Sequence, residues 1–186
     1  MDRGVPEGYE RRLVERFRQG DRQAMSALFE MHVDRVFGYA RHLLGSREDA
    51  EEVASAAFLR AFRHAADYRG DGSFRGWLFG IARNLCRDRL RQPRLLTVPA
   101  DDEEPGEMES PDRLAIREDV RRALAALPLE YREVLILCDV EEWDAPEAAR
   151  FLERSPAATK SLLYRARRAL REELMRRWEE GECHAV

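Results

Sequence analysis

Aromatic and arginine side chains are mixed over residues 68–91 in a pattern that suits nucleic acid. Tyr68, Phe74 and Trp77 carry rings that could stack on exposed bases, and Arg69 and Arg75 lie among them. Rings stack on any base face and guanidinium groups neutralise phosphate, a combination typical of single-strand binding. For one helix considered alone, an ordinary amphipathic helix with a solvated arginine face is the commoner explanation.

The apolar residues of Ser73–Arg91 are spaced three and four apart, which predicts a helix with one buried face. That stripe consists of Phe74, Trp77, Leu78, Ile81, Ala82 and Leu85. The opposite side is basic and polar, with Arg83, Asn84, Arg87, Asp88 and Arg91. The helix should end before Pro93, because proline disrupts a helix interior.

The composition indicates a soluble, helix-rich protein. Of the 186 residues, 37% are charged and 44% hydrophobic, and glycine (11) and proline (8) are sparse. Mean hydropathy is -0.60. No apolar run reaches the ~20 residues that a membrane helix needs, and the first ten residues lack the apolar core of a secretory signal. We therefore expect a cytoplasmic protein with no membrane insertion.

The three cysteines predict neither a disulfide framework nor a metal site. Cys86, Cys138 and Cys183 are far apart and odd in number, and Cys86 and Cys138 lie in apolar helical context, where a small buried thiol is the expected role. Cys183 and His184 are adjacent in the tail, and two neighbouring ligands are a weak metal signal. We expect no metal and no cofactor.

Charge is segregated along the chain, although the net charge is only -4. Residues 83–94 hold five arginines against one aspartate, and residues 101–112 hold seven acidic residues and no basic one. Residues 154–177 hold seven arginines and one lysine against two glutamates. Alternating blocks of this kind predict more than one kind of partner surface.

Periodicity and capping signals predict an all-α protein. The expected helices cover residues 9–19, 23–44, 47–65, 74–92, 114–127, 129–140, 145–152 and 157–178. Proline and acidic residues around 93–111 predict a linker without a core of its own. We therefore expect two small helical domains, residues 1–94 and 113–180, joined by a flexible acidic linker at 95–112 and followed by a tail at 181–186.

The last two expected helices are joined by a short turn, and the second is rich in Lys and Arg near its start. This arrangement fits a helix-turn-helix, whose second helix enters the major groove. The side chains that would enter the groove are Thr159, Lys160, Ser161, Tyr164, Arg165 and Arg168. A bundle helix with a basic outer face is the alternative at this point.

Taken together, these stretches resemble the extracytoplasmic-function (ECF) sigma factors, promoter-recognition subunits of bacterial RNA polymerase in the sigma-70 family. The resemblance covers about residues 13–174. The stretch GSREDAEEVASAAFLRAFR is similar to the family's polymerase-binding helix. The stretch YRGDGSFRGWLFGIARNLCRDRLR is similar to the segment that melts and reads the minus-ten element. LPLEYREVLIL and the helices after it are similar to the domain that reads the minus-thirty-five element.

The resemblance implies partners and residue roles. The partners would be core RNA polymerase, at the clamp region of its largest subunit, promoter DNA and an anti-sigma factor. Polymerase binding would fall to Asp49, Glu52, Ser55, Ala56 and Leu59. Minus-ten DNA binding would fall to Tyr68, Arg75, Arg83, Asn84, Arg87 and Arg91, with Asn84 at the site that captures a flipped base. The groove residues of the helix-turn-helix would read the minus-thirty-five element.

Three features depart from the family pattern. Many members have Gln-Glu where this chain has Ser55-Ala56, and members usually have Gly-Thr-Val where it has residues 157–159. They also carry glycine in the turn, where this chain has Glu153, so the turn must use another conformation or hold a non-glycine residue left-handed. Pro146 is tolerable only in the opening turn of its helix.

One alternative to a sigma factor remains open from the residues. Residues 1–95 could be a sensor or dimerisation bundle of a stand-alone helix-turn-helix regulator, and the acids at 48–52 could merely complement a helix dipole. An enzyme is not expected, because no nucleophile–base set, phosphate-binding glycine loop or metal set is visible.

Overall fold

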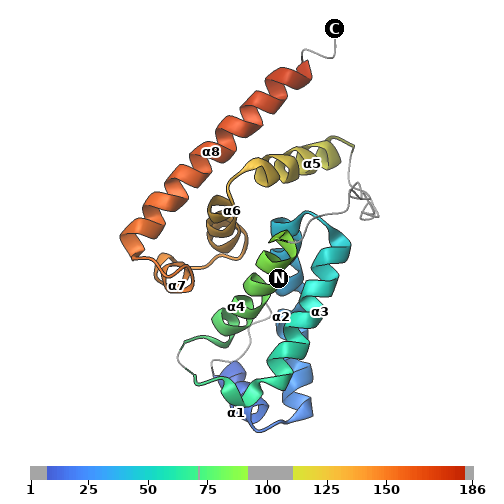
Figure 1. The fold of residues 1–186 in the computed structure, drawn as a ribbon, viewed down its shortest axis with the longest axis vertical. Helices are drawn as coiled ribbons and strands as arrows, with labels where there is room; N and C mark the ends of the chain where they lie inside the picture. Colours follow the sequence, from blue (N-terminus) through green and yellow to red (C-terminus); the bar gives the residue numbers. More distant parts are fainter. Residues whose placement is uncertain (1–7, 71, 92–110, 183–186) are drawn as a thin grey trace. The chain divides into compact units, whose positions relative to one another are not determined.

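A computed structural model describes residues 8–70, 72–91 and 111–182 of the chain, and these residues are helical apart from short turns (Figure 1). The elements are α1 (Tyr9–Arg18), α2 (Arg22–Leu44), α3 (Arg47–Arg63), η1 (Ala65–Asp67), α4 (Phe74–Arg91), α5 (Pro111–Ala126), α6 (Leu129–Leu135), η2 (Ile136–Val140), α7 (Ala145–Phe151) and α8 (Pro156–Glu182). The predicted all-α fold is confirmed.

The chain divides into two compact units. Helices α1 to α4 belong to the first, except that residues 41–47, where α2 ends and α3 begins, group with α5 to α8 in the second. The predicted linker at 95–112 lies outside the described residues except for its last two, which begin α5. The tail residues Cys183 and His184 also lie outside them.

In the first unit, α2, α3 and α4 lie side by side and α1 contacts η1 near one end of them (Figure 1). Local signals explain the helix ends. Gly20 and Gly45 follow α1 and α2 with positive φ, and the Asp21 carboxylate accepts from the backbone N–H groups of Gln23 and Ala24 at 2.9 and 3.2 Å. Asp21 therefore caps α2.

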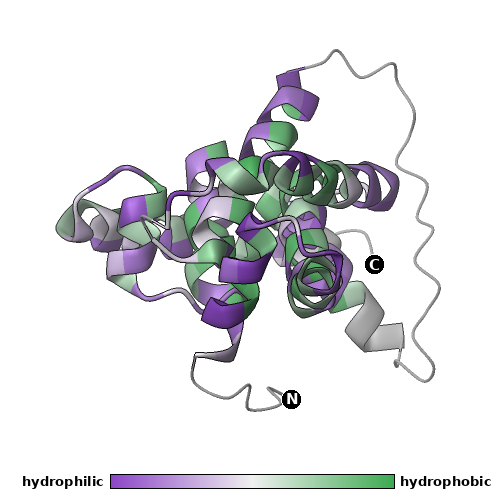
Figure 2. Cartoon of the chain, turned by 90° about the horizontal axis from the view of Figure 1, so that it is seen from below, coloured by the Kyte–Doolittle hydropathy of each residue, from purple (hydrophilic) through white to green (hydrophobic). Residues whose placement is uncertain are grey.

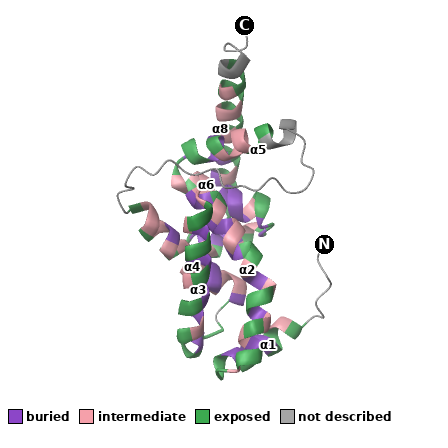
Figure 3. Ribbon diagram, turned by 90° about the vertical axis from the view of Figure 1, so that its right-hand side faces the viewer, coloured by how far each residue is buried: buried purple, intermediate pink, exposed green. Residues whose placement is uncertain are grey.

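Hydrophobic and hydrophilic residues recur along each helix (Figure 2), and buried residues recur along the same helices (Figure 3). The buried residues of α4 are Phe74, Leu78, Phe79, Ala82 and Cys86. The buried face of α4 is therefore rotated relative to the predicted one. Trp77, Ile81 and Leu85 are only half-buried, whereas Phe79 and Cys86 are 0% exposed. Burial of Cys86 is as expected.

In the second unit, α8 packs against α5, α6 and α7. The predicted helix over 129–140 is not uniform, because its last five residues form the wider π-helical turn η2. Four consecutive side chains, residues 134–137, are at most 3% exposed. Four consecutive helical residues point to all sides of the helix, so this stretch is surrounded by protein; α8 supplies part of that surrounding.

Candidate functional site

The outer face of α3 carries the residues expected to bind polymerase. Glu52 and Ser55 are exposed, Ala56 is half-buried, and Leu59 is 54% exposed. Phe29 of α2 is also 38% exposed, and its ring packs edge-on against buried Phe58 at 4.8 Å. An exposed leucine and phenylalanine beside carboxylates can supply both apolar and charged contact. The sequence prediction did not include Phe29, because it placed the polymerase contact within residues 49–59 alone.

Asp49 differs from its neighbours, because Arg89 of α4 holds its carboxylate. The guanidinium donates from Nε at 2.7 Å and from Nη2 at 2.6 Å to Asp49, and Nη2 also contacts Glu52 at 2.9 Å. The hydrogen bond to Asp49 raises the pKa of Arg89, and the charge of Glu52 adds to it. Arg89 thus joins the acidic start of α3 to the end of α4, which the sequence did not predict because the partners are 40 positions apart.

The basic face of α4 contains the expected strand-reading residues. Asn84 and Arg91 are exposed, and Arg83, Arg87 and Arg75 are half-buried. Asn84 presents an amide that can both donate and accept, the chemistry needed to recognise one base edge. Ser73 accepts from the Gly76 N–H at 3.0 Å and caps this helix.

A cluster of five rings lies at the start of α4: Phe17, Phe62, Tyr68, Phe74 and Trp77, called here the ring cluster. Tyr68 is 7% and Phe74 4% exposed, while Trp77 is half-buried. The Tyr68 hydroxyl donates to the Gly72 carbonyl at 2.8 Å. Tyr68 is therefore packed rather than presented, and stacking on a base would require the ring cluster to open. Phe17 and Phe62 lie outside the motif that contains the other three rings.

Five of the six side chains expected to enter the major groove are exposed on α8. Tyr164 is 71% exposed, and Lys160, Ser161, Arg165 and Arg168 are exposed as well. Thr159 is not: it is 1% exposed, and its hydroxyl donates to the Ser155 carbonyl at 3.1 Å. Its side chain belongs to the helix start and not to the reading surface. Ser155 accepts from the Ala158 N–H at 3.2 Å and caps α8.

The turn between α7 and α8 closes without the glycine that family members usually have there. Glu153 adopts φ 56°, a left-handed conformation. The N–H of Glu153 donates to Arg150 at 3.2 Å and that of Arg154 donates to Ala149 at 2.9 Å, which together form a Schellman motif. Pro146 lies in the first turn of α7, where it is tolerated, after Asp144 as the cap.

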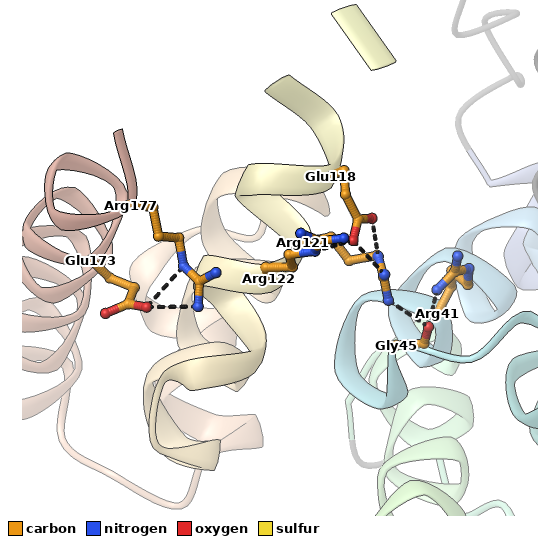
Figure 4. A network of polar contacts seen from close by, with 7 residues as sticks. All are labelled: Arg41, Gly45, Glu118, Arg121, Arg122, Glu173 and Arg177. Atoms are coloured by element: carbon orange, nitrogen blue, oxygen red, sulfur yellow. Dashed lines mark hydrogen bonds and ion pairs between the residues drawn. The ribbon is translucent and has the colours of Figure 1, made fainter. Parts of the chain in front are cut away.

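Ion pairs hold the turn before α8 and the middle of α8 against the preceding helices. Arg154 contacts Glu130 of α6 at 2.7 Å, and Arg167 contacts Asp139 of η2 at 2.5 Å. Figure 4 shows similar pairs within single helices: Glu118 accepts from Arg121 and Arg122 in α5, and Glu173 accepts from Arg177 in α8. Hydrogen bonding from Arg121 lowers the pKa of Glu118. Since Arg167 is engaged, it braces α8 while its neighbours face outward.

Within the described ranges, no group of three or more His, Cys, Asp or Glu side chains is placed to hold a metal ion. None of the described helices is long and apolar enough to cross a membrane. Cys138 is half-buried, and burial raises the pKa of its thiol.

Comparison with known proteins identifies the two units. Residues 28–95 match Sigma-70 region 2, and residues 117–170 match Sigma-70, region 4. The chain is 35% identical over 155 residues to the ECF RNA polymerase sigma factor SigM of Mycobacterium tuberculosis, covering 81% of this chain and 77% of SigM. The chain belongs to the ECF sigma factors of the sigma-70 family. Its function is therefore that of a sigma factor in transcription initiation and not that of a stand-alone regulator.

Two further comparisons agree with this assignment. The sigma factor is 34% identical over 166 residues to the ECF RNA polymerase sigma factor SigE of Mycolicibacterium smegmatis, covering 83% of this chain but 64% of the longer SigE. The sigma factor RpoE from Bartonella quintana, co-crystallised with the anti-sigma factor NepR, has the same fold, with a TM-score of 0.68. The match covers 81% of this chain and 96% of that chain at 21% identity.

Proposed function

We propose that this sigma factor binds core RNA polymerase through the outer face of α3 and reads the separated minus-ten strand with the basic face of α4. The observation that carries the proposal is that Asn84 and Arg91 are exposed on the side of α4 opposite its buried stripe. A base flipped out of the duplex needs a polar pocket beside positive charge, and flipping costs a few kcal/mol that such a pocket can offset.

Core binding is assigned to Glu52, Ser55, Ala56 and Leu59, with Phe29 as a further apolar contact. The target is the clamp region of the largest polymerase subunit. Asp49 contributes indirectly, because its carboxylate is engaged by Arg89. This contact ties the polymerase-binding helix to the strand-reading helix, so that docking of α3 places α4.

The start of α8 is assigned to the minus-thirty-five element. Lys160, Ser161, Tyr164, Arg165 and Arg168 form the reading set, and Thr159 is left out because it is buried. Residues 1–94 and 113–180 would be the two functional domains. The protein acts in the cytoplasm, where polymerase is, and performs no catalysis of its own. Its likeness in fold to a sigma factor solved with an anti-sigma factor supports such a factor as a regulator.

Substitution of Asn84 tests the proposal. Asn84→Ala should leave core binding unchanged and reduce open-complex formation, because the flipped base loses its hydrogen-bonding partner. Permanganate reactivity of thymines in the minus-ten region reports the open complex. Glu15→Gln, an exposed change on α1, is the control and should behave like the wild type. Normal melting by Asn84→Ala would remove Asn84 from the reading site.

A further inference from the structure

Helix α1 lies outside residues 28–95, the part that matches Sigma-70 region 2, yet it supplies a central ring of the ring cluster. Phe17 of α1 is 0% exposed. Its ring centroid lies 5.2 Å from that of Phe74, 6.1 Å from that of Trp77 and 6.2 Å from that of Phe62. One side chain of α1 therefore contacts the end of α3 and the first turn of α4 together.

The same cluster fixes both ends of the loop that leads into α4. At one end, the Tyr68 ring packs 5.2 Å from Trp77 and 5.9 Å from Phe74. Its hydroxyl holds the Gly72 carbonyl near the other end. Gly70 and Gly72 both have positive φ, a conformation that glycine adopts more readily than residues with a Cβ. Phe17 and Tyr68 share Phe74 and Trp77 as ring neighbours, so moving Phe17 would loosen the packing of Tyr68.

A polar contact fastens α1 a second time. The Glu10 carboxylate contacts Nε2 of His32 at 3.0 Å, and the His32 side chain is only 6% exposed. The His32 ring lies 5.6 Å from Phe74. The hydrogen bond with His32 lowers the pKa of Glu10, with help from the charges of Arg75 and Arg35. Glu10 thus places a negative charge near Arg75, one of the residues assigned to DNA.

We propose that α1 is a positioning element for strand reading, in which Phe17 and the Glu10–His32 pair hold Tyr68 and the first turn of α4 in the arrangement that accepts the melted strand. The proposal rests on the proposed function of α4. Neither Phe17 nor Glu10 touches DNA in this account. They act through Tyr68, Phe74 and Arg75.

The test compares substitutions in α1 within the full chain assembled with core polymerase, on a promoter selected by run-off transcription. Phe17→Leu keeps an apolar side chain but removes the ring, and Glu10→Gln keeps the shape but removes the charge. The matched control is Glu15→Gln, an exposed carboxylate of the same helix that contacts Arg11 at 3.8 Å. Core affinity and open-complex formation are measured for each.

Phe17→Leu and Glu10→Gln should bind core like the wild type and form about two- to tenfold fewer open complexes, the range expected when aromatic packing or a partly buried polar contact is weakened. Glu15→Gln should match the wild type. A merely structural role would lower core affinity in parallel, which contradicts the proposal, as would normal melting by both variants. If Asn84→Ala also melts normally, the proposed function itself fails. If Asn84→Ala alone is defective, only the role of α1 is refuted.

Discussion

Glu153→Gly is expected to stabilise the unit formed by α5 to α8, because Glu153 is left-handed at φ 56°. Its side chain is exposed, and the motif that closes α7 uses only backbone atoms of Glu153 and Arg154. Glycine can therefore keep both hydrogen bonds while removing the clash of Cβ with the backbone. The substitution therefore stabilises the turn without removing a side-chain contact.

The size of the effect follows from two opposing terms. A left-handed residue other than glycine costs about 1–2 kcal/mol, and the greater freedom of glycine in the unfolded chain offsets about 0.4–1 kcal/mol of this. A net gain of about 1 kcal/mol remains. For a unit of this size, such a gain raises the melting temperature by about 4–8 °C.

Trp143 provides the readout, because it is 4% exposed and its ring lies 5.1 Å from that of Phe151 at the end of α7. Thermal unfolding of the full chain followed by tryptophan emission should give a higher midpoint for Glu153→Gly. Arg150→Gly is an exposed change inside the right-handed part of α7. It should destabilise the unit by about 1 kcal/mol and so lower the midpoint. An unchanged or lower midpoint for Glu153→Gly would refute the reasoning about strain.

Three further predictions concern separate surfaces. The pKa of Glu10 is lowered by its hydrogen bond to His32 and by the charges of Arg75 and Arg35. The contact of Glu10 should therefore stabilise the fold fully above the ordinary pKa of 4.5, and this stabilisation should disappear as the pH falls through the lower folded pKa. Urea titrations should show Glu10→Gln less stable than the wild type at pH 7 and the difference shrinking in acid, whereas a constant difference would disprove the linkage. Leu59→Ala should weaken core binding about tenfold in a fluorescence titration, since burying a leucine is worth about 1.5–3 kcal/mol, and unaltered affinity would remove Leu59 from the interface. Arg165→Ala should weaken binding to the upstream promoter element by about 1–3 kcal/mol in a holoenzyme gel-shift assay, with equal binding indicating that the recognition surface lies elsewhere.

The helices themselves could be predicted from the sequence, because their signals are local. Gly20 and Gly45 end helices, Asp21 and Asp144 cap them, and Pro146 lies in a first turn as its chemistry requires. The left-handed conformation of Glu153 was one of the two outcomes predicted for a turn without glycine. The other was a different turn conformation.

What could not be predicted depends on contacts between residues far apart in the chain. Spacing placed Ile81 and Leu85 in the core, but the partners of α4 select Phe79 and Cys86 instead. Thr159 fits a groove pattern, yet the packing of α8 buries it. The pairing of Arg89 with Asp49 and of Phe17 with Phe74 joins segments 40 and more positions apart. No periodic signal carries such information.

Run-off transcription with purified core polymerase on genomic fragments tests the central claim most directly. We expect discrete transcripts that require this protein, and their loss when Asn84→Ala replaces the wild type. Binding of the free protein to duplex DNA, with no change in the transcripts made by core polymerase, would contradict the account.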